Sequence, residues 1–194
     1  MPDFRDFTLY VVRHGETESN VAGWACGHDD SPLTEDGRDH ARANGRTLRE
    51  IVDDLSAYDF YASSQHRACC TMELLRETAG LPVTGYHADR RLMEGNLGDH
   101  TRMPAREMIA LANNSGDPWN YQRPNGESMA DVHVRVGRFL NTLKRDSVLV
   151  SHALTSMLIR AHYLNLSPEE ALRYHMPNAG LLRLSMGTEA AFGR

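Results

Sequence analysis

The stretch LYVVRHGETESN (residues 9–20) begins as an apolar run and ends in polar residues. The run itself, residues 8–12, is short and unbroken, as in a central strand of a sheet that is covered on both faces. Arg13 and His14 follow side by side, and Gly15, which lets backbone approach closely, comes next. Taken alone, this tripeptide favours a structural strand end with a hydrogen-bonded imidazole. Other segments must bring further chemistry to the same place before a functional site is indicated.

The length and composition indicate one cytoplasmic domain. The chain has 194 residues, of which 41% are hydrophobic and 24% charged. No apolar run approaches the roughly 20 residues of a membrane helix, and residues 1–10 carry charges where a signal peptide has its apolar centre. Cys26, Cys69 and Cys70 form a poor disulfide framework, which suits a reducing compartment. We therefore expect no membrane partner.

The charge pattern constrains the partners. The net charge is −5 and is spread without long single-sign runs, which argues against a nucleic acid. If the substrate is an anion, positive potential must be gathered locally against the global sign. The sequence allows an oligomer but does not indicate one.

Strand-like and helix-like segments alternate along the chain. After residues 8–12, the strand-like runs are residues 59–63, 147–151 and 180–186. Apolar stripes near a period of 3.6 predict helices over residues 38–55, 65–79 and 128–144, an apolar helix over 153–164, and a helix start at 167–170. This alternation predicts an α/β fold with a mostly parallel central sheet and helices on both faces.

The segment 81–126 differs from the rest. It is rich in Gly, Pro, Asn and Arg and has no strong hydrophobic period. We interpret it as an irregular excursion, or small lid, over one end of the sheet, and not as a separate domain. The prediction is a single domain over residues 1–194.

Three predicted strands end in charged or titratable residues. The first leads into Arg13 and His14, and the third into His152. After the second strand, Ser64 can cap a helix whose first turn then contains Arg67. Because ligands of an open parallel sheet bind beyond the carboxyl ends of its strands, these side chains should converge.

Two guanidinium groups and two imidazoles around one point are typical of an anion site. Arginine binds phosphate through two parallel hydrogen bonds, and helix N-termini at the same edge would add unpaired N–H groups. Arg67 in a first helical turn opposes the helix dipole, which favours an anionic partner. A neutral histidine can attack phosphorus when one ring nitrogen faces it and the other donates to a backbone carbonyl. The arginines would then stabilise the transition state.

Six blocks in order carry a resemblance to a known family. They are VVRHGETESN, GHDDSPLTEDGRDHA, ASSQHRACCT, LMEGNLGDH, PNGES and VSHA. Together they resemble the histidine phosphatase superfamily, the phosphoglycerate-mutase-like proteins, over most of the chain. The resemblance implies a three-layer, phosphoglycerate-mutase-like fold and a hydrolase of phosphoric monoesters that needs no metal and no cofactor.

The resemblance also implies roles for individual residues. His14 would be the phosphorylated nucleophile, and Glu94 would protonate the leaving group and later activate water. The phosphoryl oxygens would be held by Arg13, Arg67, His152 and Asn20. Thr17 and Gly27 would be further substrate contacts.

Two departures from the family pattern concern specificity. Ala153 follows His152 where Gly is usual, which narrows the space behind that imidazole. After Gly98 the chain has DHTRMP, where many relatives have an aromatic residue and another Gly. The natural substrate is not determined, and its determinants should lie within residues 97–122.

Other chemistries fit the sequence less well. The remaining histidines show no metal-ligand spacing with a carboxylate, and we interpret them mostly as surface or loop residues. Cys70 and Arg76 have the spacing of cysteine-dependent phosphatases, but the residues between them are helix formers without a phosphate-binding loop.

Three functions remain in order of preference. The first is a phosphatase that forms phosphohistidine on a small phosphorylated metabolite, with inorganic phosphate as product or inhibitor. The second is a phosphoglycerate-type mutase, which is less favoured because the segment between Glu94 and His152 is short. The third is a non-catalytic phosphate-binding module, which is less favoured because no catalytic position is lost.

Overall fold

The computed structural model describes residues 3–178 and 180–192. In that part of the chain, six strands form one sheet with the order β3-β2-β4-β1-β5-β6. The strands β1 (Leu9–Arg13), β2 (Asp59–Ser63), β3 (His87–Asp89) and β4 (Ser147–Ser151) are parallel. The strands β5 (Leu181–Ser185) and β6 (Thr188–Phe192) are antiparallel. The predicted mostly parallel sheet is confirmed.

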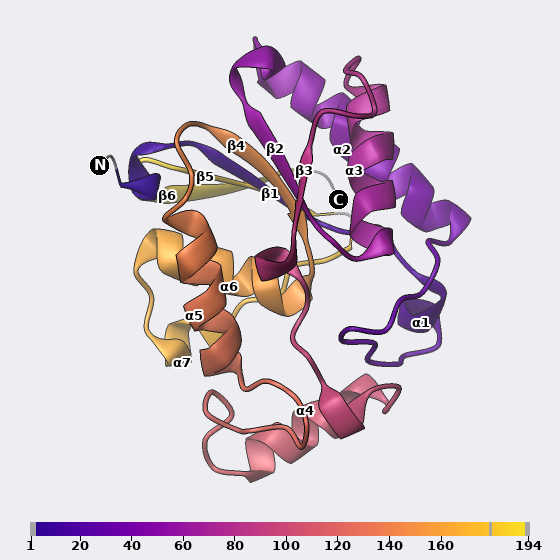
Figure 1. Ribbon diagram of the computed structural model, residues 1–194, viewed down its shortest axis with the longest axis vertical. Coiled ribbons are helices and arrows are strands. Elements are labelled where there is room, and N and C mark those ends of the chain that lie inside the picture. Colours follow the sequence, from indigo (N-terminus) through magenta and orange to yellow (C-terminus); the bar gives the residue numbers. More distant parts are fainter. Residues whose placement is uncertain (1–2, 179, 193–194) are drawn as a thin grey trace.

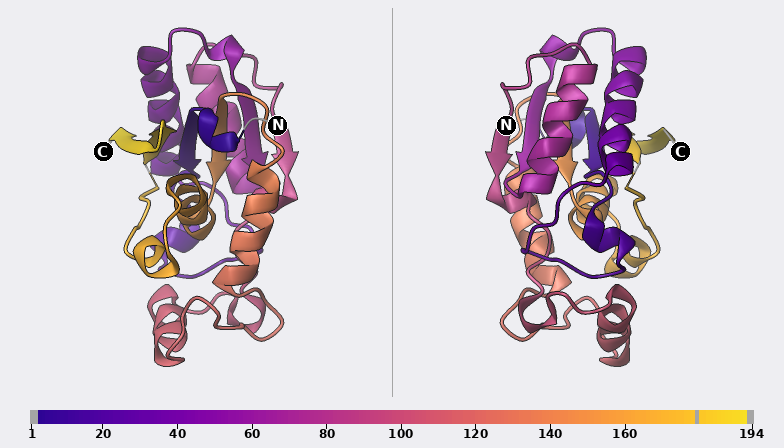
Figure 2. Two further views of the ribbon diagram at one scale, coloured as in Figure 1. Left: turned by 90° about the vertical axis from the view of Figure 1, so that its left-hand side faces the viewer. Right: turned by 90° about the vertical axis from the view of Figure 1, so that its right-hand side faces the viewer.

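Helices cover both faces of this sheet (Figures 1 and 2). One face carries α2 (Glu35–Ile51) and α3 (His66–Thr78), and the other carries α5 (Met129–Leu140) and α6 (Ala153–Leu164). The remaining α-helices are α1 (Glu18–Val21), α4 (Ala105–Asn114) and α7 (Pro168–Leu172), and the 3₁₀ helices are η1 (Phe4–Asp6), η2 (Leu55–Ala57), η3 (Arg90–Leu92) and η4 (Gly98–His100). No helix within the described residues is long and apolar enough to cross a membrane.

The core explains why the central strands are continuous apolar runs. In β1, Leu9 and Val11 pack on the α5–α6 side, whereas Tyr10 and Val12 pack on the α2–α3 side. Successive side chains of a strand point to opposite faces, so a strand between two helical layers needs apolar residues at every position. All four side chains are almost fully buried. Each contributes about 1.5–3 kcal/mol when buried.

Three predicted boundaries were wrong. The helix predicted over 38–55 begins at Glu35, because Thr34 caps it by accepting a hydrogen bond from Gly37 N at 2.9 Å. It ends at Ile51 because Val52 is extended. The helix predicted from 128 to 144 ends at Leu140. Two short strands, β3 and β6, were not predicted because β3 has only three residues and β6 is mostly exposed.

The segment 81–126 is more regular than predicted. It contains β3, η3, η4 and the ten-residue helix α4. Figures 1 and 2 show α4 beyond the carboxyl ends of the parallel strands, where a lid was predicted. We call residues 97–122 the lid. Its helix was not predicted, although Ala105, Met108, Ile109 and Ala112 follow a helical spacing; of the α4 residues, Ala112 alone is buried.

Candidate active site

The sheet register brings the ends of three strands together. Arg13 pairs with Ser151 between β1 and β4, and the His14 amide donates to Ser151 O at 2.9 Å. On the other side of β4, β2 ends at Ser63, beside the same strand end. The rings of His14 and His152 consequently lie 5.0 Å apart, centroid to centroid, at 61°.

His14 is held in one tautomer. Its Nδ1 lies 2.7 Å from the carbonyl oxygen of Gly15, so Nδ1 must carry the hydrogen and donate it. Nε2 then holds the lone pair. Burial, together with the nearby charges of Arg67 and Arg13, lowers the pKa of His14 well below its usual value. The imidazole is therefore neutral near pH 7, as a nucleophile must be.

His152 lies at the N-cap of α6 and is fully buried. Its Nε2 is 2.7 Å from Ser63 Oγ, and its Nδ1 has no hydrogen-bond partner within the described part of the chain. Burial and the charge of Arg67 lower the pKa of His152 well below its usual value, so this ring is neutral as well.

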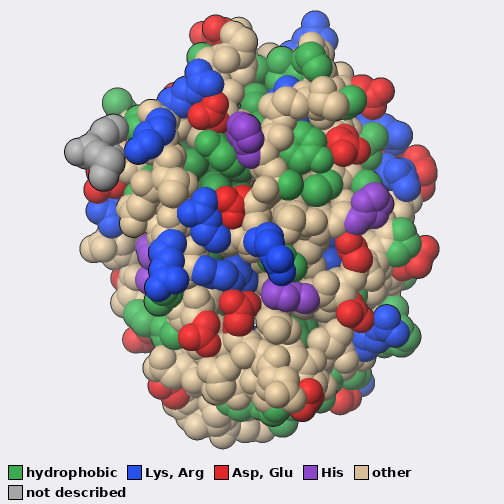
Figure 3. Space-filling view, in the orientation of Figure 1, with side chains coloured by type: hydrophobic (Ala, Val, Ile, Leu, Met, Phe, Trp, Pro, Cys, Tyr) green, Lys and Arg blue, Asp and Glu red, His purple; other side chains and the backbone are tan. Residues whose placement is uncertain are grey.

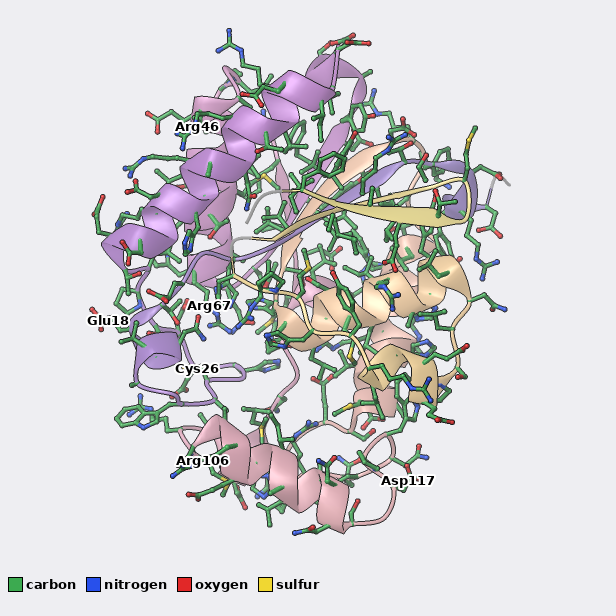
Figure 4. All side chains as sticks on the ribbon, turned by 180° about the vertical axis from the view of Figure 1, so that it is seen from behind. Glu18, Cys26, Arg46, Arg67, Arg106 and Asp117 are labelled. Carbon is green, nitrogen blue, oxygen red and sulfur yellow. The ribbon has the colours of Figure 1, made fainter. Side chains whose placement is uncertain are left out.

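Arg67 is held by a loop that precedes α2. One guanidinium nitrogen, Nη1, donates to Asp29 O at 2.7 Å and to Asp30 Oδ1 at 3.2 Å, and Nη2 donates to Gly27 O at 2.9 Å. Arg67 is only 3% exposed, and Figure 4 shows it between the base of α3 and the loop around α1. Its orientation is thus fixed before any ligand binds.

Asp30 also occupies the N-terminus of α3. Its carboxylate accepts from the amides of His66 at 2.7 Å and Arg67 at 3.4 Å. The predicted cap Ser64 is wrong, since the N-cap is Gln65 and the carboxylate comes from outside the helix. The anionic partner expected for Arg67 is present inside the protein.

The expectation of unpaired helix amides at the site was therefore wrong in part. At the start of α6, the amide of Leu154 donates to Glu94 Oε2 at 3.3 Å. Glu94 Oε1 accepts from its neighbour Gly95 N at 3.0 Å and from Thr155 Oγ1 at 3.4 Å. Orphan amides must be satisfied in the free protein, and two carboxylates do this here.

Arg13 and Glu94 belong to the same charged centre. Arg13 Nη1 donates to Met176 O at 2.9 Å. Burial lowers the pKa of Arg13, whereas the charge of Glu94 raises it and that of Arg67 lowers it. The cations of this centre lie mostly below the surface, whereas Figure 3 shows Lys and Arg side chains gathered on the outer face over α5 and η3. Arg13 and Arg67 therefore bring two cations to this centre although the net charge is −5, and Asp30 and Glu94 bring two carboxyl groups.

Three weaker candidates have structural partners. Thr17 caps α1, and Asn20 Oδ1 accepts from Thr17 N at 3.1 Å and from Asn178 Nδ2 at 3.0 Å. The side-chain amide of Asn178 also donates to His14 O at 3.2 Å, which ties Asn20 to the backbone of His14. Gly27 has a positive φ of 52°, and its carbonyl oxygen is used by Arg67 and Gln65.

Gly15 has a packing role. A Cβ atom there would lie 2.0 Å from Gly37 O, and a Cβ atom at Gly37 would lie 2.0 Å from Glu16 O. Each of the two glycines therefore lets the other backbone approach, and this contact seats the start of α2 directly behind His14.

Two further histidines border this centre: His28 Nε2 lies 2.9 Å from Glu94 O, and burial together with the charge of Arg13 lowers the pKa of His175. His133 and His162 are not surface loop residues as predicted, since they lie on α5 and α6 and their rings stack at 3.7 Å. Burial and the neighbouring His162 lower the pKa of His133 to about 4. Cys70 and Arg76 both lie within α3, so their spacing forms no phosphate-binding loop. No group of three or more potential metal ligands occurs among the described residues.

Sequence reasoning missed three positioning residues: Asp30, Ser63 and Gln65. Gln65 Oε1 accepts from Glu94 N at 2.9 Å, while its Nε2 donates to Gly27 O at 2.9 Å. Asp30 lies within the GHDDSPLTEDGRDHA block, and the other two lie within the ASSQHRACCT block. For Ser63 and Gln65, polar residues directly at a strand end were the available signal; Asp30 lies in the loop between α1 and α2 and had none.

The comparisons with known proteins agree with this geometry. A sequence model of the histidine phosphatase superfamily (branch 1) matches residues 9–191. The chain is 29% identical to the phosphoglycerate mutase-like protein AT74H of Arabidopsis thaliana over 76% of its length, and it spans 62% of that protein. It is 31% identical to the adenosylcobalamin/alpha-ribazole phosphatase of Salmonella typhimurium (strain LT2), covering 81% of this chain and 80% of that one. The structure of Bacillus stearothermophilus YhfR superposes with a TM-score of 0.75 at 28% identity, over 96% of each chain.

Proposed function

This chain belongs to the histidine phosphatase superfamily (branch 1), and on that premise we propose that it hydrolyses phosphoric monoesters through a phosphohistidine at His14. The observation that carries the proposal is the fixed tautomer of a buried, neutral imidazole between two arginines. His14 donates from Nδ1 to Gly15 O, which leaves the Nε2 lone pair as the nucleophile. The phosphatase name of the Salmonella relative supports hydrolysis.

In the first step, Nε2 of His14 attacks phosphorus and the bond to the ester oxygen breaks. Arg13, Arg67 and His152 hold the equatorial oxygens and stabilise the negative charge of the transition state. Glu94, as the carboxylic acid, gives its proton to the departing alkoxide. Glu94 accepts a hydrogen bond from Leu154 N at the start of α6, on the same edge of the sheet as His14.

In the second step, water attacks the phosphohistidine. Glu94, now a carboxylate, accepts the proton of that water, and the phosphorus–nitrogen bond breaks. Inorganic phosphate leaves, and His14 returns to its neutral form. The substrate we propose is a small phosphorylated metabolite in the cytoplasm, a location that suits the three free cysteines.

Rapid quenching tests the intermediate. After mixing with a ³²P-labelled monoester, the wild-type protein should carry label that is stable to base and labile to acid, as a phosphorus–nitrogen bond is. His14→Ala should carry none and should lose turnover of p-nitrophenyl phosphate. His87→Ala, which removes an exposed histidine on β3, is the matched control and should behave as wild type. Full turnover by His14→Ala would reject the proposal.

The same assay separates hydrolysis from the mutase alternative. With 3-phosphoglycerate, a phosphatase releases phosphate and glycerate, whereas a mutase returns 2-phosphoglycerate. We expect release of phosphate to dominate. Rapid isomerisation with little phosphate would favour the mutase.

A further inference from the structure

We propose that Ser63 is a positioning residue that fixes the hydrogen of His152 on Nδ1, so that this imidazole donates to a phosphoryl oxygen of the substrate. This inference rests on the proposed function, because the acceptor belongs to the same site. Ser63 is the last residue of β2, and His152 follows β4, the neighbouring strand. Both side chains are fully buried, with 2.7 Å between Ser63 Oγ and His152 Nε2.

The hydroxyl group of Ser63 has a defined direction. A serine hydroxyl offers one donor and two acceptor lone pairs. Ser63 Oγ already accepts from the amide of Gln65 at 3.3 Å. His152 Nε2 is its remaining partner among residues 3–178 and 180–192, so the hydroxyl hydrogen satisfies its bonding by pointing at Nε2. Nε2 is then the acceptor.

The surroundings of His152 Nδ1 also indicate that the ring hydrogen is on Nδ1. His152 Nδ1 is buried and has no partner in the described structure. Buried polar atoms are almost always hydrogen-bonded in the working state. Phosphoryl oxygens only accept, so Nδ1 must carry the hydrogen to bond one of them. With the hydrogen on Nε2 instead, a lone pair would face those oxygens and the Ser63 hydrogen would lack an acceptor.

The two histidines thus share one tautomer but present opposite sides to the substrate. In His14, Nδ1–H donates to Gly15 O, and the lone pair of Nε2 is free to face the substrate. In His152, the lone pair of Nε2 is spent on Ser63, and Nδ1–H is presented. One ring attacks phosphorus, and the other binds an oxygen. The first arrangement depends on a backbone carbonyl, whereas the second depends on a side chain that substitution can remove.

Two measurements on Ser63→Ala test this role. Ring ¹⁵N shifts distinguish a protonated from an unprotonated nitrogen, and loss of one signal set in His152→Gln assigns His152. In wild type we expect a protonated Nδ1 and an unprotonated Nε2, with or without inorganic phosphate. In Ser63→Ala the hydrogen should be shared between both nitrogens. The inhibition constant of inorganic phosphate should rise, and kcat/KM for p-nitrophenyl phosphate should fall, by about 10- to 100-fold each.

Ser156→Ala is the matched control. Ser156 is also fully buried and lies on α6, but its Oγ has no partner in the described part of the chain. This variant removes a buried hydroxyl and keeps the backbone bond from Ser156 N to His152 O at 2.8 Å, so its ¹⁵N spectrum and kcat/KM should match wild type. Thermal unfolding of both variants separates a loss of folding from a loss of positioning.

The outcomes separate this proposal from the proposed function. An active wild type whose His152 is protonated on Nε2, or on both nitrogens, overturns the role of Ser63 even if Ser63→Ala fails to fold. A Ser63→Ala variant with unchanged ¹⁵N shifts and kcat/KM overturns it as well. A wild type that turns over no monoester, yet shows the Ser63-dependent tautomer, rejects the proposed function and supports the positioning role.

Discussion

The catalytic edge of the sheet and the lid are built by opposite means. At the edge, His14 and His152 are placed by strand register and are almost fully buried, as are their partners Ser63 and Arg67. The lid is mostly exposed, and Ala112 is the buried residue of α4. It is joined to the loop after α1 through backbone hydrogen bonds, including Arg102 N to Ala25 O at 2.8 Å. Under the proposed function, the catalytic residues stand on the buried part, and we expect the exposed part to select the leaving group.

The sharpest way to test this contrast is to remove one arginine from each region. Arg67→Ala should lower kcat/KM by about 10³- to 10⁵-fold, because a buried guanidinium fixed by Asp29, Asp30 and Gly27 no longer meets the transition state. Arg106→Ala, on the exposed side of α4 (Figure 4), is the control and should change kcat/KM little. Steady-state kinetics with p-nitrophenyl phosphate measures both. Equal losses would erase the distinction between edge and lid.

The proposed role of Glu94 as proton donor predicts that the effect of its substitution on kcat depends on the leaving group. Glu94→Gln should lower kcat by about 10²- to 10⁴-fold for an alkyl phosphate, whose alkoxide must be protonated as it leaves. The loss should be much smaller for p-nitrophenyl phosphate, since its leaving group departs as a stable anion. A plot of log kcat against leaving-group pKa gives the readout. An equal loss with every ester would assign proton donation to another residue.

Burial at the edge also predicts a pH dependence of stability. His14 and His152 are neutral when folded because burial lowers the pKa of each, whereas the unfolded chain takes up protons near the usual pKa of 6.5. The unfolded state therefore binds more protons below that pH. The free energy of unfolding should be level above about pH 6.5 and should fall as the pH drops below it.

Urea unfolding across this pH range measures that stability change. The double variant His14→Gln/His152→Gln should show a smaller decline than wild type, and His133, whose pKa burial lowers to about 4, should account for part of the remainder. A wild type with constant stability down to about pH 5 would show that both rings are protonated as easily when folded as when unfolded.

Much of the edge could be predicted from sequence, and little of the lid could. Residues 59–63, 147–151 and 153–164 were predicted with the boundaries that the structure has, because buried elements must carry apolar residues at defined periods. The convergence of Arg13, Arg67 and His152 was predicted because each follows a strand, and the carboxyl ends of parallel strands share one edge of the sheet.

The misses have two different origins. Asp30, and not the predicted Ser64, caps the start of α3, where free amides were expected. It lies in a loop 36 residues before His66. A partner that distant leaves no local pattern in the sequence. The lid helix α4 is a different case: its apolar residues follow a helical spacing, but the helix is short and lies in a segment rich in Gly, Pro and Asn, which was interpreted as irregular throughout.

The smallest predicted effect concerns an ion pair between the lid and the loop that holds Arg67. Arg102 Nε donates to Asp29 Oδ2 at 2.9 Å, and the carbonyl of Asp29 in turn accepts from Arg67. The Arg102 and Asp29 side chains are 72% and 43% exposed, so solvent weakens their attraction. Arg102→Ala should therefore change kcat/KM by less than about three-fold.

Arg102→Gly is the informative partner variant, because the φ of 64° at this position favours glycine and the lid backbone bonds remain. If Arg102→Ala lowers kcat/KM far more than Arg102→Gly does, backbone strain in the lid affects the position of Arg67. If both cost as much as Arg67→Ala, the ion pair itself orders Arg67, and the edge is not organised independently of the lid.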